Sequence, residues 1–121
     1  MSLQVVRTKI LEEFEQDGTK LEVPLEDLCP NNHILCNVPV IDYDKLRVKL
    51  VGDRCTSADA LLIGKWVNFI EFKTGFAKED KSIKEDTKKE NLQLAIRLKA
   101  YESLALFEKV LLPMLMKKRD L

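Results

Sequence analysis

The chain has 121 residues, 45% of them hydrophobic, which is enough for one domain with a modest core and too little for two. Its 20 basic and 20 acidic residues cancel, so net charge gives no general attraction to nucleic acid, and this counts against a free-standing DNA binder. No secretory leader and no apolar run of the roughly 20 residues that span a bilayer is visible, so we expect a cytoplasmic protein.

The first predicted element is an amphipathic helix over residues 2–16. Asp17-Gly18 ends its apolar pattern, as a helix terminus would. Glu13 follows the apolar Ile10 by about one turn and lies near the boundary of the buried stripe. The apolar positions at helical spacing are Leu3, Val6, Ile10, Leu11 and Phe14.

Residues 18–44 read as a loop-rich insertion, because prolines and asparagines interrupt every longer pattern. Three sulfurs and one imidazole could gather here, a set that suits tetrahedral Zn²⁺. The alternative is reduced cysteines packed as small hydrophobes beside a loop histidine. The residues concerned are Cys29, His33, Cys36 and Cys55.

Residues 45–51 are expected to form the first core strand. Apolar Leu46, Val48 and Leu50 alternate with basic residues, which is typical of a half-exposed strand. The basic outer face could lie along a phosphate backbone, or it could simply protect an ordinary edge strand from aggregation.

The most informative segment is a predicted β-hairpin made of two apolar runs, 58–63 and 67–74, joined by Gly64-Lys65-Trp66. A charged side chain in a buried strand loses its hydration, so it is tolerated there only if it pairs or holds a metal. The runs contain three such residues: Asp59, Glu71 and Lys73.

The register of this hairpin decides whether the charges meet. A two-residue turn would set Asp59 opposite Ile70 and leave Glu71 on the other face of the sheet. A three-residue loop instead pairs Ile63 with Val67 and brings Asp59 opposite Glu71, with the lysine on the same face. We predict the second register, because it lets the charges satisfy one another.

Two carboxylates and a lysine form a recognisable chemical set. Mg²⁺ and Mn²⁺ take oxygen ligands, commonly one or two carboxylates together with water and substrate phosphate. A lysine beside them can orient an attacking water and offset charge that develops on a phosphate. The alternative is a buried ion pair that only ties the hairpin together.

A charged segment over residues 77–88 is expected to be mobile, and a long helix begins at about residue 88. Gln93, Arg97 and Tyr101 share one stripe of this helix, and a broad apolar side over residues 92–106 is expected to pack on the sheet. Basic residues over 78–99 and at 117–119 are the candidates for a local phosphate-binding surface.

Residues 104–116 carry more apolar side chains than one face of a helix can bury against so small a sheet. Pro113 interrupts this region, so it either continues the helix or forms a very short strand. We therefore expect the chain to form a homodimer, or to join a larger complex, through its C-terminal part.

Asp59, the eleven-residue spacer and Glu71-Phe72-Lys73 resemble the PD-(D/E)xK nuclease superfamily, whose fold is restriction-endonuclease-like. The chain departs from that pattern in having Ala58 before the aspartate and in lacking a clear last strand. The resemblance implies a divalent cation, Mg²⁺ or Mn²⁺, held by Asp59 and Glu71, with Lys73 as the catalytic lysine. It also implies supporting roles for Glu13 and Gln93.

The sequence thus predicts a single α+β domain over residues 1–121. We expect a small, mostly antiparallel sheet of three or four strands, flanked by an N-terminal and a long C-terminal helix, with a restriction-endonuclease-like core whose last strand is short or missing. The expected function is metal-dependent hydrolysis of nucleic acid, with DNA as the expected substrate. The alternatives are a non-catalytic binding module with the nuclease fold and a small zinc-stabilised interaction domain.

Overall fold

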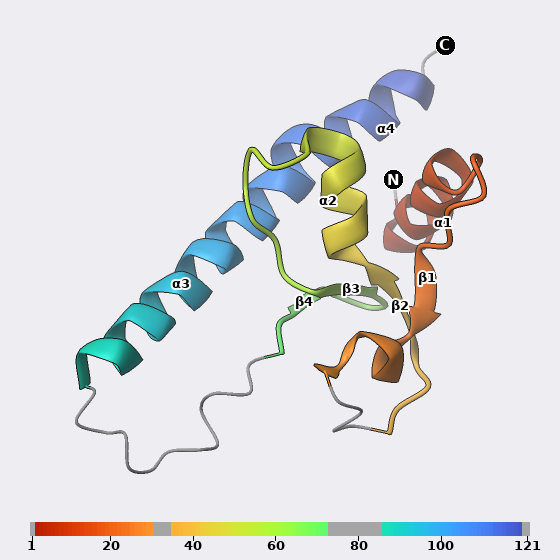
Figure 1. The fold of residues 1–121 in the computed structure, drawn as a ribbon. Coiled ribbons are helices and arrows are strands. Elements are labelled where there is room, and N and C mark those ends of the chain that lie inside the picture. The colour runs from red at the N-terminus through yellow and green to blue at the C-terminus, as the bar shows by residue number, and fades with distance from the viewer. Residues whose placement is uncertain (1, 31–34, 73–85, 120–121) are drawn as a thin grey trace.

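The structure, a computed structural model, describes residues 2–30, 35–72 and 86–119. It is an α+β fold with a four-stranded sheet and a long C-terminal helical rod (Figure 1). The elements in chain order are α1 (Leu3–Phe14), β1 (Glu22–Pro24), the 3₁₀ helix η1 (Leu25–Leu28), β2 (Pro39–Asp42), α2 (Tyr43–Val51), β3 (Ala60–Ile63), β4 (Val67–Ile70), α3 (Asp86–Ala105), the π-helical segment η5 (Leu106–Leu111) and α4 (Leu112–Arg119).

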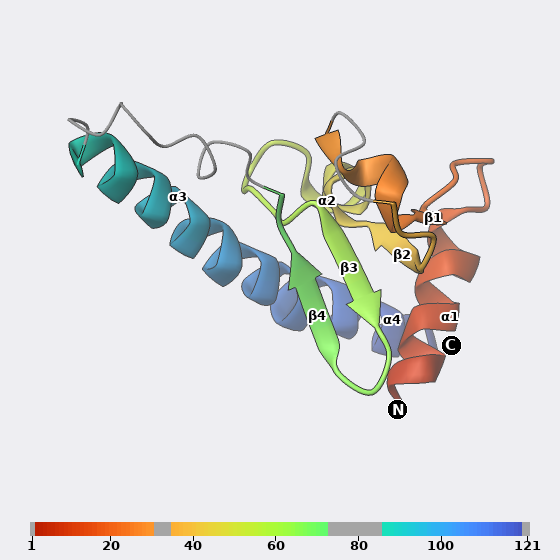
Figure 2. The same ribbon diagram turned by 90° about the horizontal axis from the view of Figure 1, so that it is seen from below.

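The sheet has the order β1-β2-β3-β4, and each neighbouring pair is antiparallel. The helices α1, α2, α3 and α4 lie on one side of it, as the two views in Figures 1 and 2 show. The prediction of a small antiparallel sheet with an N-terminal and a long C-terminal helix is therefore confirmed. No strand follows β4 in the described part of the chain.

The hydrophobic core lies between the sheet and the helices. Tyr43 packs against Phe69 with ring centroids 5.4 Å apart, and Phe69 meets Phe107 edge-on at 6.1 Å. These three rings connect α2, β4 and η5. Around them the buried apolar residues are Val6, Ile10, Leu21, Ile41, Leu46, Ala58, Leu61, Ile63, Leu106, Leu111 and Leu115.

The predicted strand over residues 45–51 is wrong, because this segment is the helix α2. Asp42 caps it by accepting the Lys45 N–H at 3.1 Å, and Gly52 ends it with a positive φ of 63°. Tyr43 and Leu46 are fully buried, three residues apart on one face of the helix. The alternation of leucine with charge in this segment fits a helical stripe as well as it fits a strand.

The region expected to be a loop-rich insertion contains two strands of the sheet. β1 and β2 pair through Val23 and Val40, and β2 then pairs with β3 through Ile41 and Leu61. Two of the three prolines that suggested a loop occupy β-strand ends, where a missing N–H is tolerated. Pro24 ends β1, and Pro39 begins β2.

The C-terminal helices form a continuous rod, and Pro113 is the second residue of α4, directly after the π-helical segment η5, where the regular α-helical hydrogen-bond pattern is interrupted. The rod meets the core through Leu106, Phe107, Leu111 and Leu115, and its N-terminal half extends beyond the sheet. The expectation that the whole apolar side over residues 92–106 packs on the sheet is therefore wrong. Within the described ranges, no helix is both long and apolar enough to cross a membrane.

Candidate functional site

The hairpin of β3 and β4 has the register that the sequence predicted. Ile63 pairs with Val67 and Ala60 with Ile70, which sets Asp59 opposite Glu71 at the end of the hairpin. Because side chains alternate along a strand, both carboxylates lie on the same side as the core residue Leu61. That is the side of the sheet that the helices cover.

The Asp59 residue is fixed by its own backbone and by a neighbouring amide. Its N–H donates to the Ile70 carbonyl at 2.9 Å, and its carbonyl accepts the Tyr43 N–H at 3.2 Å. One carboxylate oxygen, Oδ2, accepts the Phe72 N–H at 2.8 Å. These contacts hold the aspartate at the junction of β3, β4 and α2.

The pKa of the Asp59 carboxyl is raised, chiefly because burial disfavours the ionised form. The neighbouring Glu71 carboxyl raises it further, through like charge and through a side-chain hydrogen bond between the two groups. The Phe72 N–H and the Lys99 ammonium act in the opposite direction. Two half-buried carboxyls in hydrogen-bonding contact cannot both ionise without repulsion, so the pair holds a proton more readily than separate carboxyls do.

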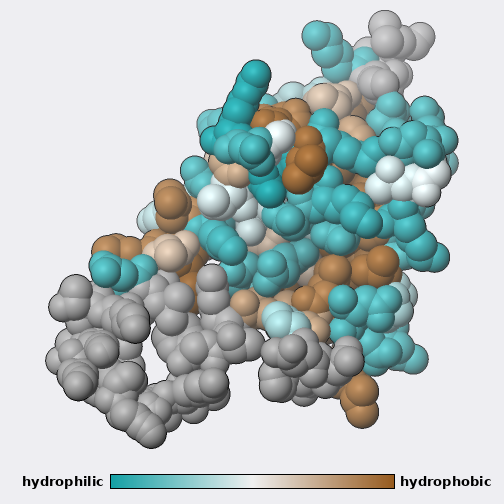
Figure 3. All heavy atoms as spheres, in the orientation of Figure 1, coloured by the Kyte–Doolittle hydropathy of each residue, from teal (hydrophilic) through white to brown (hydrophobic). Residues whose placement is uncertain are grey.

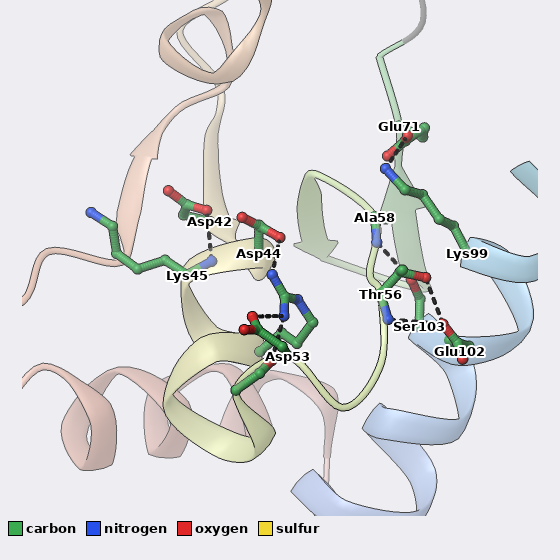
Figure 4. A network of polar contacts seen from close by, with 12 residues as sticks. Asp42, Asp44, Lys45, Asp53, Thr56, Ala58, Glu71, Lys99, Glu102 and Ser103 are labelled. Atoms are coloured by element: carbon green, nitrogen blue, oxygen red, sulfur yellow. Dashed lines mark hydrogen bonds and ion pairs between the residues drawn. The ribbon is translucent and has the colours of Figure 1, made fainter. Parts of the chain in front are cut away.

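Lys99 of α3 reaches the Glu71 carboxyl of this pair, as Figure 4 shows. Its Nζ donates to Glu71 Oε2 at 2.8 Å, and the Glu71 side chain is only 14% exposed. The hydrogen bond to Glu71 raises the pKa of the lysine, so the ammonium stays protonated at neutral pH. The described site therefore combines two carboxyls with one fixed positive charge.

Two further residues of α3 fasten the segment that leads into Asp59 (Figure 4). Glu102 Oε1 accepts the Thr56 backbone N–H at 2.8 Å and the Thr56 hydroxyl at 2.6 Å. The hydroxyl of Ser103, which is fully buried, accepts the Ala58 N–H at 2.7 Å. Because Ala58 directly precedes Asp59, the helix that supplies Lys99 also sets the position of the aspartate.

The backbone of Ser103 also connects α3 to α2, through Tyr43. Its carbonyl accepts the Tyr43 hydroxyl at 2.8 Å, and Tyr43 is itself fully buried in the core. The carboxylate pair thus rests on a continuous set of buried contacts that includes α2, α3 and the hairpin.

The structure brings together some of the predicted site residues. Asp59 and Glu71 meet as expected, while Lys73 lies outside the described residues. Glu13 is in α1, and the described groups that act most on the Asp59 carboxyl are Phe72, Glu71 and Lys99. Gln93 is in α3, but its side chain is not described. The roles of Lys73, Glu13 and Gln93 therefore stay predictions.

The sequence analysis did not assign Lys99 to the site, although it placed this residue among the basic candidates for phosphate contact. Arg97 and Tyr101 lie on the helical stripe that the sequence analysis singled out together with Gln93, and both are exposed. The residues that reach the site are Lys99, Glu102 and Ser103, spaced as neighbours on one helical face. In the sequence, the spacing of these three polar residues is the one signal that this face of the helix has polar contacts, although it does not show with which segment.

The predicted zinc ligands do not gather in the described part of the chain. All three cysteines are free thiols, and His33 is not among the described residues. Cys29 is buried at the end of η1, whereas Cys55 packs against the main core. Among the described residues no group of three or more histidine, cysteine, aspartate or glutamate side chains could hold a metal.

Two carboxylates are nevertheless a sufficient protein contribution for Mg²⁺ or Mn²⁺, since these ions retain waters and bind substrate phosphate. Asp59 and Glu71 fit that requirement by chemistry and by their mutual contact.

Comparison with protein-family models, with curated proteins and with solved structures finds no match to this chain.

Proposed function

We propose that this domain is a divalent-metal-dependent nuclease in which Asp59 and Glu71 hold the cation. The observation that carries the proposal is the direct contact of these two carboxyls across the hairpin, on the helix-covered face of the sheet. A partly buried carboxyl such as Asp59, whose pKa is raised by burial and by a neighbouring carboxyl, is more typical of functional sites than of structural ones.

The electrostatics of the pair support a cation rather than a purely structural role. Lys99 supplies one positive charge against two carboxyls, so full ionisation leaves a local excess of negative charge. A divalent cation would relieve that repulsion and would displace the shared proton. A structural ion pair would need only one of the two carboxylates.

The residues would divide the work of phosphodiester hydrolysis. A bound Mg²⁺ or Mn²⁺ supplies Lewis acidity and a more acidic water. Lys99, held at Glu71, presents a positive charge that can offset charge on a bound phosphodiester. Lys73 is proposed to orient the attacking water, and Glu13 and Gln93 to support the site, as the resemblance to PD-(D/E)xK nucleases implies.

The partner would be nucleic acid, and DNA is the proposed substrate. The neutral net charge requires a local phosphate-binding surface. Arg97, exposed on α3 two residues before Lys99, is a described candidate for that surface. Two alternatives remain as proposals. A non-catalytic binding module with the nuclease fold would use this surface without cleaving nucleic acid. A zinc-stabilised interaction domain would instead depend on Cys29, His33, Cys36 and Cys55.

A cleavage assay with matched variants tests the proposal. The purified chain is incubated with single- and double-stranded DNA and with RNA, in Mg²⁺, Mn²⁺ or EDTA. We expect metal-dependent cleavage that Asp59→Asn and Glu71→Gln each reduce at least about a hundredfold, since each removes charge from the metal site. Glu12→Gln, an exposed glutamate of α1, is the control and should cleave like the parent.

Three results would contradict the nuclease. The parent chain could fail to cut any of these substrates, or it could cut them equally in EDTA, or the Asp59→Asn variant could retain full activity. Binding of DNA without cleavage would instead favour the binding module. Zinc that co-purifies in equal amount with the chain would favour the zinc-stabilised domain.

A further inference from the structure

Much of α3 is exposed, and one line of exposed residues along it, which we call the outer seam, has a regular spacing. It consists of Asn91, Leu94, Leu98, Tyr101 and Ala105, and all five are exposed. Leu94 is 57% exposed, Leu98 52% and Tyr101 74%. Figure 3 shows hydrophobic, brown surface over α3 at the left edge of the molecule.

The spacing of the outer seam is that of a coiled coil. Its members follow one another by steps of three, four, three and four residues, which average 3.5. The face that meets the rest of the chain is a different one, carrying Lys99, Ser103 and Leu106. The seam is therefore not an unfilled part of the domain's own core.

We propose that a second copy of this chain covers the outer seam, with α3 packed parallel to α3 in a two-stranded coiled coil. In heptad terms Asn91, Leu98 and Ala105 occupy a positions, and Leu94 and Tyr101 occupy d positions. A single polar asparagine at an a position favours two parallel strands in fixed register, because the two amides can bond each other across the seam.

The flanking charges are complementary in that arrangement. Arg97 occupies a g position and Glu102 the e position five residues later, the two positions that meet between parallel helices. Both described bonds from Thr56 to Glu102 use Oε1, so Oε2 is the oxygen placed to accept from Arg97 of the second copy. An antiparallel pair would not bring these two positions together.

The seam ends where the helix changes its winding. The π-helical segment η5 begins at Leu106 and turns the following residues Phe107 and Leu111 toward the domain core. The contact is thus about two heptads long, shorter than a standard interface of about 1,600 Å² requires. We expect a dimer that dissociates at micromolar concentration rather than a permanent one.

This interface differs from the one expected from the sequence. Of the apolar residues over 104–116, Leu106, Phe107, Leu111 and Leu115 are buried within one chain, so these four cannot supply the contact, whereas Leu104 and Met116 are exposed. The outer seam also lies on a different helical face from Lys99. The dimer would use Arg97, which is also the described candidate for the phosphate-binding surface, but its test measures association alone and requires no nuclease activity.

Sedimentation equilibrium over about 1 to about 200 µM tests the dimer, because a weak dimer changes its population over such a range. We expect the parent to pass from monomer to dimer, and Leu98→Lys to raise the dissociation constant at least about tenfold, since it places unpaired charge in the seam. Ala100→Lys is the matched control, exposed on the same helix but outside the seam, and should behave like the parent. Circular dichroism checks that both variants keep the parent's helix content.

A parent that is monomeric at every concentration, or a Leu98→Lys variant that dimerises like the parent, would overturn the proposal.

Disulfide trapping tests the orientation of the two helices. Tyr101→Cys should form a covalent dimer on mild oxidation, because equal d positions face each other in a parallel pair, and Ala100→Cys should not exceed the parent's background. Trapping only in a mixture of Leu98→Cys and Tyr101→Cys chains would show an antiparallel pair and refute the parallel one.

Discussion

The two faces of α3 contrast sharply, although they alternate along the same turns of helix. The inner face carries Lys99, Glu102 and Ser103, each tied to the segments that hold the carboxylate pair. The outer face carries Leu98 and Tyr101, which are largely exposed. The same helix thus supports the candidate site with polar side chains and exposes large apolar side chains on its other face.

This contrast shows that apolar character alone does not tell where a helix packs. In α3 the buried contacts near the site are hydrogen bonds to backbone amides, such as that from Ala58 to Ser103. Such bonds satisfy groups that would otherwise be costly to bury. The large apolar residues nearby are then available for contact with another chain.

The largest effect should separate two aromatic residues of the rod. Phe107→Ala should lower the free energy of unfolding by about 3–5 kcal/mol, because it leaves a cavity in the core beside Phe69. Tyr101→Ala, measured at a concentration where the chain is monomeric, should change it by less than about 0.5 kcal/mol. Urea denaturation measures both, and equal losses would remove the contrast between the faces.

Loss of the Ser103 hydroxyl should have an intermediate effect. Ser103→Ala removes the hydroxyl without adding volume and leaves the buried Ala58 N–H without its acceptor, at a cost of about 1–3 kcal/mol. Ser103→Thr keeps a hydroxyl at this position and should recover part of that loss. A Ser103→Ala protein as stable as the parent would mean that the bond does not hold the approach to Asp59.

Replacing the aspartate of the pair should stabilise the metal-free protein at neutral pH. The folded protein binds a proton at Asp59 more readily than the unfolded chain does, so the metal-free fold loses stability as pH rises above the usual carboxyl pKa of about 3.9. Asp59→Asn removes this loss and still offers an oxygen to the Phe72 N–H. Its melting temperature should exceed the parent's at pH 8 and approach it near pH 4.

The smallest effect concerns Glu102 on the inner face. The two bonds from Thr56 lower the pKa of this carboxyl, so they stabilise the fold above the usual carboxyl pKa, and this contribution fades as the pH falls below it. Glu102→Gln should therefore lower the melting temperature slightly at pH 7 and not at pH 3. A difference from the parent that stays constant over this range would rule out the charge as its cause.

The hairpin could be predicted from the sequence because polar residues within apolar runs restrict the register. The three-residue loop is the one that lets Asp59 approach Glu71, and the observed register, with Ile63 opposite Val67, has that loop. The first helix was also readable, with Ser2 as its cap. The helix α2 was misread because its leucines fit both periods, although Asp42 offered a capping signal.

Lys99 could not be placed at the site from local pattern alone. It lies 28 residues from Glu71, and their contact depends on how the C-terminal rod crosses the sheet. That crossing is set by Phe107 and Leu111 packing in the core and by the bonds of Ser103 to Ala58 and Tyr43, all of which join segments far apart in the sequence. The apolar side of α3 was assigned to the sheet for the same reason, since sequence periodicity does not show how far a helix extends beyond its domain.

The most direct test of the central claim is a Mn²⁺ titration followed by electron paramagnetic resonance of the free ion. We predict one site per chain whose affinity for Mn²⁺ rises as the pH increases, because the Asp59 carboxyl, whose pKa is raised, must lose its proton to bind the cation. Asp59→Asn and Glu71→Gln should each abolish this site, and Glu12→Gln should keep it. A parent chain that binds no Mn²⁺, or one whose binding survives both substitutions, would contradict the assignment of these carboxylates as a metal site.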